Sequence, residues 1–474
     1  MQTPRRVIVV GGGVSGLATA YFLRRLDGPG TEVTLVESSA RLGGKVLTQR
    51  VCGYPVDAGP DALLVRVPAV RSLLEDLGLT DAVVEPGAAG AFVWSRGRLR
   101  PLPPSTLFGV PQKLLPLLRS GLLSPVGIAR AALDLVLPRR RLRDEDPSVG
   151  ALLRPRLGAQ VFDRLVDPLL GGVYAGRADL LSARSTVPEI EAIARAHRSI
   201  YLGTRARPAP STTAGPALVT LDGGLSRLVD ALSAACDGCE MELGAGVEDL
   251  SRHPDGYLLR LTDGRELTAD AVVLATPAFV TAGLLAQIAP AAAAAAAEVP
   301  YADVASVTFV YPRAALARDL DGTGFLVPPR EGMLLVGCSW LSAKWPHLAD
   351  PSVVLVRGMV GRFGDARFTT MDDEELVKRV HGELVRTMGL TAAPKEASVQ
   401  RWPRAMPQYT VGHQDRLDRL DEGLSGLPGL PGLAVTGAAY RGVGLASCVG
   451  QAERTARDLL AQLTAANVPS EGRA

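Results

Sequence analysis

Hydrophobic and polar positions in the first 37 residues predict a strand, a helix and a second strand. Residues 7–10 are a run of β-branched residues, as expected of a buried strand. Residues 17–23 continue as a helix, and residues 32–36 predict the second strand. A turn rich in glycine joins the first strand to the helix. This order predicts a βαβ unit, the building block of a parallel sheet.

Three segments far apart in the chain have the pattern of one nucleotide-binding domain. Residues 257–267 alternate and turn at Asp263-Gly264, which predicts a hairpin, and residues 272–276 predict a buried strand. Residues 432–437 predict a last strand, followed by a helix from about residue 449. The domain is therefore expected to be interrupted by two insertions, which build the substrate side.

The insertions have different patterns. In the second, residues 304–311, 334–338 and 353–359 predict strands of an antiparallel sheet. In the first, residues 114–137 mix apolar helical patches with prolines, and a basic cluster follows at 139–143. We interpret the first insertion as an ordinary helical subdomain. The alternative is an exposed apolar face that makes weak peripheral contact with a membrane.

These patterns predict a mixed α/β (α+β) fold with a Rossmann-like nucleotide-binding domain, an antiparallel-sheet substrate domain and a helical lobe. The expected boundaries are 1–75, 220–280 and 405–474 for the nucleotide-binding domain, 76–100, 200–219 and 281–404 for the substrate domain, and 101–199 for the helical lobe.

Composition narrows the function classes. The chain has 474 residues, of which 47% are hydrophobic and 21% charged, as in globular enzymes. The net charge of +2 gives no support for nucleic-acid binding. The five histidines are scattered without metal-ligand spacing, so no metal is expected. Cys236 and Cys239 form a C-x-x-C that we interpret as incidental.

A transmembrane span and a signal peptide are not expected. Residues 271–297 are uncharged but contain Pro277 and Pro290, so we expect a buried strand followed by a helix. The N-terminal residues lack the pattern of a secretion signal. We therefore expect a cytoplasmic protein.

The glycine-rich turn has the spacing of a dinucleotide site. Gly11, Gly13 and Gly16 fit G-x-G-x-x-G, and Glu37 follows about 20 residues later, where an acid reaches a ribose hydroxyl. The acid favours FAD or NAD over NADP. Residues 38–45 then resemble the R-x-G-G-[KR] segment of the flavin amine-oxidase and desaturase superfamily. This resemblance favours FAD and implies that the Rossmann-like domain is an FAD-binding domain of flavin amine-oxidase type.

Five segments outside this unit carry further motifs, at 53–60, 171–176, 322–328, 405–409 and 440–448. Together they resemble a narrower family, the oxygen-dependent protoporphyrinogen/coproporphyrinogen oxidases of heme biosynthesis. Residues 338–346 look like the Gram-positive-type members that are associated with coproporphyrinogen III. Ala91 departs from the arginine found there in several protoporphyrinogen-specific relatives, which favours the substrate with four carboxylates.

The resemblance implies a noncovalent FAD, although Cys448 leaves covalent attachment as an alternative. The implied cofactor-binding residues are Gly11, Gly12, Gly13, Val14, Ser15, Gly16, Glu37, Ser38, Arg41, Gly44, Lys45, Gly59, Pro60, Asp61, Ala62, Val247, Trp402, Gly442, Val443 and Gly444.

The resemblance also implies oxidation of coproporphyrinogen III to coproporphyrin III, with O2 as acceptor and release of H2O2. Hydride would pass to flavin N5 three times, and no catalytic side chain is assigned. The substrate needs an apolar wall and cations for its carboxylates. The candidates are Arg66, Tyr174, Arg177, Phe325, Leu326, Val327 and Lys344.

Other functions stay open at this point. They are protoporphyrinogen IX oxidase activity, a flavin amine oxidase, a carotenoid-type desaturase, and a flavin-binding scaffold without turnover. An enzyme of the heme pathway is an open candidate for a protein partner.

Overall fold

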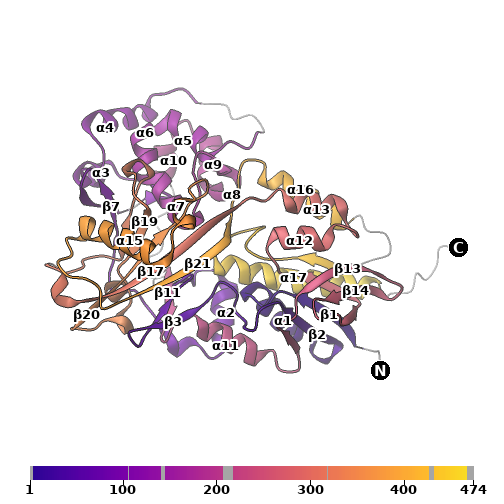
Figure 1. Ribbon diagram of the computed structural model, residues 1–474. Helices are drawn as coiled ribbons and strands as arrows, with labels where there is room; N and C mark the ends of the chain where they lie inside the picture. Colours follow the sequence, from indigo (N-terminus) through magenta and orange to yellow (C-terminus); the bar gives the residue numbers. More distant parts are fainter. Residues whose placement is uncertain are drawn as a thin grey trace.

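A five-stranded parallel sheet organises one half of the molecule (Figure 1). The computed structural model describes residues 4–104, 106–139, 145–206, 217–317, 319–425 and 432–466. The strand order is β12 (Glu240–Leu243), β2 (Thr31–Glu37), β1 (Arg5–Val10), β16 (Ala271–Leu274) and β22 (Leu433–Val435), and every neighbouring pair is parallel. The predicted βαβ unit and the predicted strands at 272–276 and 432–437 are confirmed.

Alternate residues of β1 enter two hydrophobic cores because successive side chains of a strand point to opposite faces. Val7 and Val9 pack under α1 (Val14–Asp27), α2 (Pro68–Asp76), α11 (Ser226–Ala235) and α17 (Leu445–Ala466). Ile8 and Val10 pack on the other face. That face is covered by β13 (Val247–His253), β14 (Gly256–Leu261), β15 (Glu266–Ala269), α12 (Ala278–Leu285), α13 (Pro290–Ala297) and α16 (His413–Ser425).

A seven-stranded sheet forms the second half, with α15 (Asp373–Met388) packed on it. Its strands, in spatial order, are β21 (Glu396–Pro407), β17 (Tyr301–Pro312), β20 (Val353–Val360), β19 (Leu335–Ser339), β18 (Gly324–Leu326), β7 (Phe92–Ser95) and β8 (Arg98–Pro101). The predicted antiparallel arrangement is found throughout except between β18 and β7, which run parallel.

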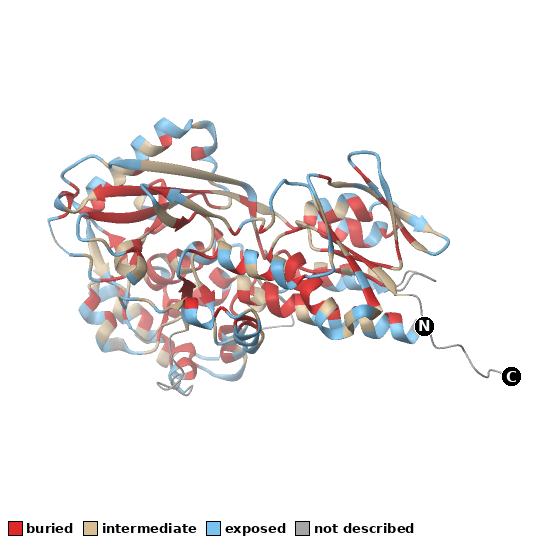
Figure 2. Ribbon diagram, turned by 90° about the horizontal axis from the view of Figure 1, so that it is seen from below, coloured by how far each residue is buried: buried red, intermediate tan, exposed pale blue. Residues whose placement is uncertain are grey.

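Smaller elements connect the two halves. Two short sheets are formed by β3 (Thr48–Val51) with β4 (Tyr54–Asp57), and by β5 (Leu63–Leu64), β11 (Leu218–Leu221) and β6 (Val83–Val84). The remaining short helices are η1 (Gly28–Gly30), η2 (Thr80–Ala82), η5 (Arg313–Ala315), η6 (Pro329–Glu331), α14 (Leu341–Lys344), η7 (Pro346–Leu348) and η8 (Arg367–Thr370). Figure 2 shows buried residues running along the sheets, with exposed loops at the periphery.

The helical lobe has a hydrophobic core of its own. It contains β9 (Thr106–Leu107), β10 (Val110–Pro111), α3 (Leu114–Ser120), α4 (Pro125–Ala132), η3 (Leu133–Leu135), α5 (Val149–Leu157), α6 (Ala159–Val161), η4 (Phe162–Val166), α7 (Asp167–Tyr174), α8 (Ala183–Thr186), α9 (Pro188–Ala196) and α10 (Ile200–Arg205). The segment η4 is a π-helix between α6 and α7.

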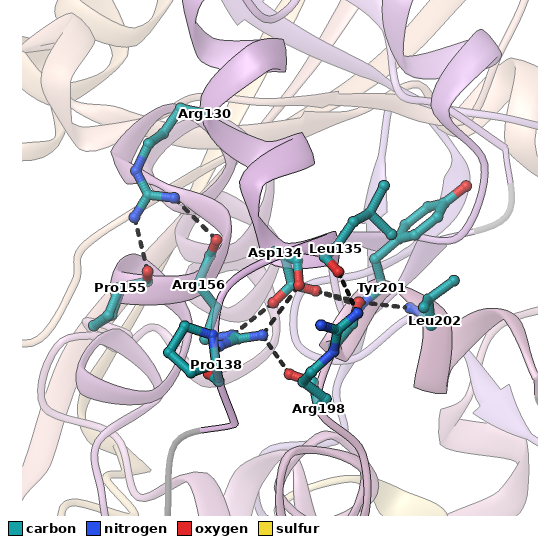
Figure 3. A network of polar contacts seen from close by, with 10 residues as sticks. Arg130, Asp134, Leu135, Pro138, Pro155, Arg156, Arg198, Tyr201 and Leu202 are labelled. Atoms are coloured by element: carbon teal, nitrogen blue, oxygen red, sulfur yellow. Dashed lines mark hydrogen bonds and ion pairs between the residues drawn. The ribbon is translucent and has the colours of Figure 1, made fainter.

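A buried ion pair joins three elements of this lobe, η3, α5 and α10 (Figure 3). Arg156 Nε donates to Asp134 Oδ1 at 2.6 Å, and Asp134 Oδ2 accepts from Ser199 Oγ at 2.7 Å and from the Tyr201 N–H at 2.9 Å. Arg156 also donates to the Pro138 carbonyl at 2.7 Å. Asp134 is fully buried, so its charge is satisfied by these groups rather than by water.

Three boundaries differ from the sequence prediction. Most of α12 and all of α13 lie after the expected boundary at 281, yet they pack on the parallel sheet because their alanine-rich faces complete its second core. Ile200 of α10 belongs to the core of the helical lobe. Helix α17 begins at Leu445, four residues before the expected start. Residues 140–144, which include most of the basic cluster, lie outside the described residues.

No helix in the described part of the chain combines the length and the apolar character that crossing a bilayer requires.

Candidate flavin site

The glycines of the first turn differ in the space around them. A Cβ on Gly11 would lie 2.9 Å from the Ala275 carbonyl oxygen, and a Cβ on Gly16 only 1.8 Å from the Gly11 oxygen. Gly11 also has a φ of +109°, a conformation that favours glycine. At Gly13 the nearest atom is Gly44 Cα at 4.0 Å. Backbone packing therefore requires glycine at positions 11 and 16, while position 13 has room for a Cβ.

Helix α1 begins directly after Gly13 without a side-chain cap and without an acid in its first turn. Its first N–H groups, which include those of Val14, Ser15 and Gly16, have no partners within the helix. Together with the positive end of the helix dipole they form a site suited to an anionic pyrophosphate.

Glu37 is held at the end of β2 by the same turn. Its Oε2 accepts from the Gly12 N–H at 2.6 Å, and its Oε1 accepts from the Ser39 N–H at 2.8 Å and from Ser38 Oγ at 3.3 Å. A carboxylate has about four lone-pair sites, so capacity for a ribose hydroxyl is left. The bond to Gly12 fixes the carboxylate beside the turn, a contact that spacing along the chain does not reveal.

The segment before Val247 approaches the same end of β2. Leu243 of β12 pairs with Glu37, and the Gly244 N–H donates to the Ser39 carbonyl at 3.0 Å. Val247 then begins β13. The structure thus brings residues 243–247 to the side of the site where Glu37 ends its strand.

Residues 41–45 form a loop that packs against Gly12 and Gly13. The Gly43 N–H donates to the Gly12 carbonyl at 2.8 Å, and Gly13 and Gly43 form a parallel bridge. Arg41 donates to the carbonyls of Gly44 at 2.5 Å and Leu42 at 3.1 Å. The Arg41 guanidinium therefore holds the loop in shape, in addition to the predicted contact with cofactor.

Lys45 lies at the junction of this loop with α17. Lys45 is exposed to solvent, yet the neighbouring protein atoms partly desolvate its ammonium group and lower its pKa. The Cys448 thiol lies near Lys45 and hydrogen-bonds to Ser15 of α1. Burial raises the pKa of Cys448. Gly444, just before α17, has no described atom within 4 Å of its Cβ position.

The segment 57–62 is fixed from the seven-stranded sheet. Trp402 Nε1 donates to the Ala58 carbonyl at 3.1 Å, and the Arg357 guanidinium donates to the Gly59 carbonyl at 2.9 Å. A Cβ on Gly59 would lie 2.0 Å from the Lys45 oxygen and 3.8 Å from Trp402. Trp402, Gly59 and Lys45 are therefore neighbours, as a shared flavin site requires.

Lys344 pairs with another candidate residue. Its Nζ lies 2.9 Å from Asp61 Oδ2, and Arg357 lies 3.3 Å from Asp61 Oδ1. Burial opposes ionisation of Asp61, but Arg357 and Lys344 outweigh it and hold its pKa below the usual range. A buried carboxylate needs such cations. The prediction that Lys344 is available for substrate is corrected accordingly, because its ammonium group neutralises Asp61.

Of the three residues predicted to form the apolar wall of the substrate site, only Leu326 lies outside the core of the seven-stranded sheet. Phe325 and Val327 are buried in the core that contains α15 residues, whereas Leu326 points the other way and is half-buried. Leu326 lies against Gly172 of α7, where a Cβ would approach it to 3.1 Å. Strand alternation is the reason, so Leu326 is the one of these three that faces the helical lobe.

The other substrate candidates lie on different elements. Arg66 is exposed on the segment between β5 and α2. Arg177 is exposed after α7, and Tyr174 is half-buried at the end of that helix, 6.0 Å from Tyr409 between ring centroids. Tyr174 ends α7, Arg177 follows this helix, and Leu326 packs against it, so these three residues lie around α7. Arg66 lies instead between β5 and α2, which pack in the core of the parallel sheet.

Tyr409 and His413 were missed by sequence reasoning. Tyr409 is buried and its hydroxyl accepts from the Gly442 N–H at 2.7 Å. His413 stacks on Tyr409 with ring centroids 4.0 Å apart. Tyr409 is the last residue of the 405–409 segment that carries part of the family resemblance, so the sequence contained a signal for it. His413 belongs to no motif, so the sequence gives no indication of its contact with Tyr409.

Comparisons with known proteins give matches over nearly the whole chain. The family model of flavin-containing amine oxidoreductases matches residues 14–460. The chain is 34% identical to coproporphyrinogen III oxidase of Bacillus subtilis (97% of this chain, 98% of the relative). It is 36% identical to the protein of the same name from Mycobacterium tuberculosis (98% and 99%).

Solved structures show the same fold. A protein from Exiguobacterium sp. 255-15, provisionally named protoporphyrinogen oxidase, superposes with a TM-score of 0.86 at 32% identity, covering 97% of this chain and 99% of the other. Putrescine oxidase superposes with a TM-score of 0.66 at 18% identity, covering 97% and 99%, which is a likeness of fold alone.

Proposed function

Because the chain belongs to the flavin-containing amine oxidoreductases, and within them to the protoporphyrinogen/coproporphyrinogen oxidase family, we propose that it oxidises coproporphyrinogen III to coproporphyrin III in heme biosynthesis. Seven relatives that carry the name coproporphyrinogen III oxidase are 30% or more identical over nearly the full chain. The proposed cofactor is a noncovalent FAD, and the proposed electron acceptor is O2.

The observation that carries the proposal is the open space left at two helix starts. A Cβ on Gly444 would meet no described atom within 4 Å and one on Gly13 none closer than 4.0 Å, while Gly11, Gly16 and Gly59 are closed in by backbone atoms. Glu37 accepts from the Gly12 N–H beside the first helix start, and Lys45 and Trp402 lie beside Gly59. Residues of this chain therefore fit an elongated anionic cofactor whose ring end lies toward Trp402 and whose ribose lies toward Glu37.

Noncovalent binding is supported by the state of Cys448. Attachment through sulfur requires a thiolate, since the thiolate is the nucleophile. Burial raises the pKa of Cys448, and the thiol hydrogen-bonds to Ser15 within the packed junction of α1 and α17. This cysteine therefore serves helix packing in the proposal.

The proposed reaction removes six electrons and six protons from the macrocycle. In balance, coproporphyrinogen III and three O2 give coproporphyrin III and three H2O2. A bound flavin supplies the two-electron oxidation. We assign to Leu326 and Tyr174 contact with the macrocycle, and to Arg177 and Arg66 contact with its carboxylates.

The test uses purified full-length protein reconstituted with FAD. Flavin absorbance, porphyrin fluorescence and H2O2 are followed with coproporphyrinogen III, protoporphyrinogen IX and a primary amine. We expect fluorescence growth with coproporphyrinogen III and about one H2O2 for every two electrons removed. Failure to bind FAD, or oxidation of the amine alone, would overturn the proposal.

Protoporphyrinogen IX is the second candidate substrate. A rice relative named chloroplastic protoporphyrinogen oxidase is 30% identical over 96% of this chain. Faster oxidation of protoporphyrinogen IX in the same assay would move the assignment to that substrate. The cytoplasmic location, weak membrane contact through the helical lobe and a heme-pathway partner stay predictions.

A further inference from the structure

The turn between α11 and β12 carries two thiols that the proposed flavin chemistry does not use. Cys236 caps the end of α11, and the Cys239 N–H donates to the Cys236 carbonyl at 2.9 Å, which closes the turn. Cys236 is buried, and its Sγ lies 3.7 Å from the Leu17 carbonyl of α1. Cys239 is half-buried. One thiol is therefore accessible from solvent while the other lies beneath it.

The two thiols also contact one another. They form a side-chain hydrogen bond, which lowers the pKa of Cys239 and raises that of Cys236. Cys239 is half-buried and Cys236 is buried, so Cys239 is the sulfur that a dissolved oxidant can reach and Cys236 is its partner. A hydrogen-bonded pair within one turn needs little movement to be bridged.

A fixed cation lies beside the turn. The Arg24 guanidinium donates to the Gly28 carbonyl at 2.8 Å and to the Thr31 carbonyl at 3.0 Å. A Cβ on Gly238 would lie 3.0 Å from this guanidinium. Arg24 favours the Cys239 thiolate, whereas the neighbouring Asp237 opposes it. The negative end of the α11 dipole also opposes a thiolate here, so the arginine has an electrostatic cost to offset.

We propose that Cys236 and Cys239 are a dithiol site that hydroperoxides oxidise to a disulfide. The Cys239 thiolate attacks one peroxide oxygen, the O–O bond breaks, and sulfenic acid and water form. The Cys236 sulfur then attacks the Cys239 sulfur, the S–O bond breaks, and a second water leaves. In sum, two thiols and H2O2 give one disulfide and two waters, with two electrons passing to the peroxide.

The other cysteines provide an internal comparison. Cys52 is exposed and has no neighbouring thiol among the described residues, and a hydrogen bond with Glu396 raises its pKa. Cys338 and Cys448 are buried, and burial raises the pKa of both. Exposure alone would make Cys52 the first site of oxidation, whereas the proposal places Cys239 first.

The test adds H2O2 in small molar excess to the full-length protein and follows each cysteine by alkylation and mass spectrometry. We expect the peptide with Cys236 and Cys239 to lose two mass units, with recovery after dithiothreitol, before Cys52 is modified. Cys236→Ser should stop at a sulfenic acid on Cys239 that dimedone traps. Cys239→Ser should abolish disulfide formation.

A pair of arginine variants tests the electrostatic part. Arg24→Gln should slow disulfide formation several-fold, whereas Arg25→Gln, on the exposed side of the same helix, should not. Alkylation of both thiols after peroxide, earlier oxidation of Cys52, or equal rates in the two arginine variants would overturn the proposal. The added peroxide makes the outcome independent of the porphyrinogen assay.

Discussion

The hydroxyl of Tyr409 accepts a hydrogen bond from the backbone N–H of Gly442 at 2.7 Å. The same hydroxyl donates to the Ala438 carbonyl at 2.7 Å, so one buried group joins both ends of the turn before α17. Tyr409 lies two residues after the end of β21, and Gly442 lies two residues before the open position at Gly444. The seven-stranded sheet thereby fixes part of the proposed flavin site on the parallel sheet.

Replacing Tyr409 with Phe should release this turn. The change leaves the Gly442 N–H and the Ala438 carbonyl without their partner, at a cost of about 1–3 kcal/mol for a buried unsatisfied group. We expect weaker FAD binding, by roughly tenfold for each 1.4 kcal/mol that acts on the bound state. Fluorescence titration with FAD and urea denaturation measure the two effects.

Tyr174→Phe is the matched control for folding. Its hydroxyl lies 3.4 Å from the Thr186 carbonyl, a long contact, so the loss in unfolding free energy should be smaller. Equal FAD affinity for Tyr409→Phe and the unchanged protein would show that the turn is held by other contacts.

Alanine at Gly16 should disrupt folding, whereas alanine at Gly13 should disrupt only cofactor binding. A Cβ at Gly16 overlaps the Gly11 carbonyl at 1.8 Å, so Gly16→Ala should disrupt packing of α1 against the sheet and prevent normal folding. A Cβ at Gly13 has no neighbour closer than 4.0 Å, so Gly13→Ala should fold. It should still lose FAD, because the new methyl group would overlap with the proposed position of the pyrophosphate, which needs close approach to the backbone here.

Circular dichroism melting without cofactor and flavin absorbance after reconstitution separate these outcomes. Gly444→Ala extends the comparison, since its Cβ also meets open space. A Gly13→Ala protein that binds FAD normally would remove Gly13 from the proposed site.

His413 should make the unfolding free energy depend on pH. Burial lowers its pKa to about 4, and Arg416 adds to the effect. An unfolded histidine titrates near 6.5, so the unfolded chain binds more protons between these values. Stability is therefore complete above about pH 6.5 and is lost as pH falls toward 4, by roughly 2–3 kcal/mol.

The measurement is urea denaturation between pH 4.5 and 7.5 for the unchanged protein and for His413→Gln. The variant should show a smaller loss on acidification. His197→Gln, at an exposed histidine, should keep the full loss. Parallel pH profiles for all three proteins would contradict this account.

Local patterns in the sequence predict the parts of the fold that depend on neighbours along the chain. The β-branched run before Gly11 and the turn at Asp263-Gly264 fixed the positions of β1 and of the β14–β15 hairpin because periodicity and turn chemistry are local. The site required contacts between distant residues. Lys344 and Asp61 are separated by 283 positions, and no pattern indicates that the lysine neutralises this buried acid.

One error could have been avoided from the sequence. Phe325 lies in β18 and Val327 directly follows it in extended backbone, so the two share a face and Leu326 lies on the other. Placing all three on one wall conflicted with that alternation. The alanine-rich segment 290–297 was read correctly as a helix, but its packing on the parallel sheet depends on the core it completes.

The buried pair of Arg156 and Asp134 should be essential for the helical lobe. Asp134→Ala leaves the Arg156 guanidinium buried without its carboxylate, and also removes the acceptor for Ser199 and for the Tyr201 N–H. Breaking a buried pair in this way costs about 3–5 kcal/mol. The exposed pair of Arg457 and Glu453 is the control, because Arg457→Ala should cost no more than about 0.5 kcal/mol.

Hydrogen exchange of α5 and α7 measures the lobe separately from the parallel sheet. We expect faster exchange there in Asp134→Ala, while α1 and α17 keep their protection because the parallel sheet has a core of its own. Unchanged exchange in α5 would show that apolar packing alone holds the lobe together.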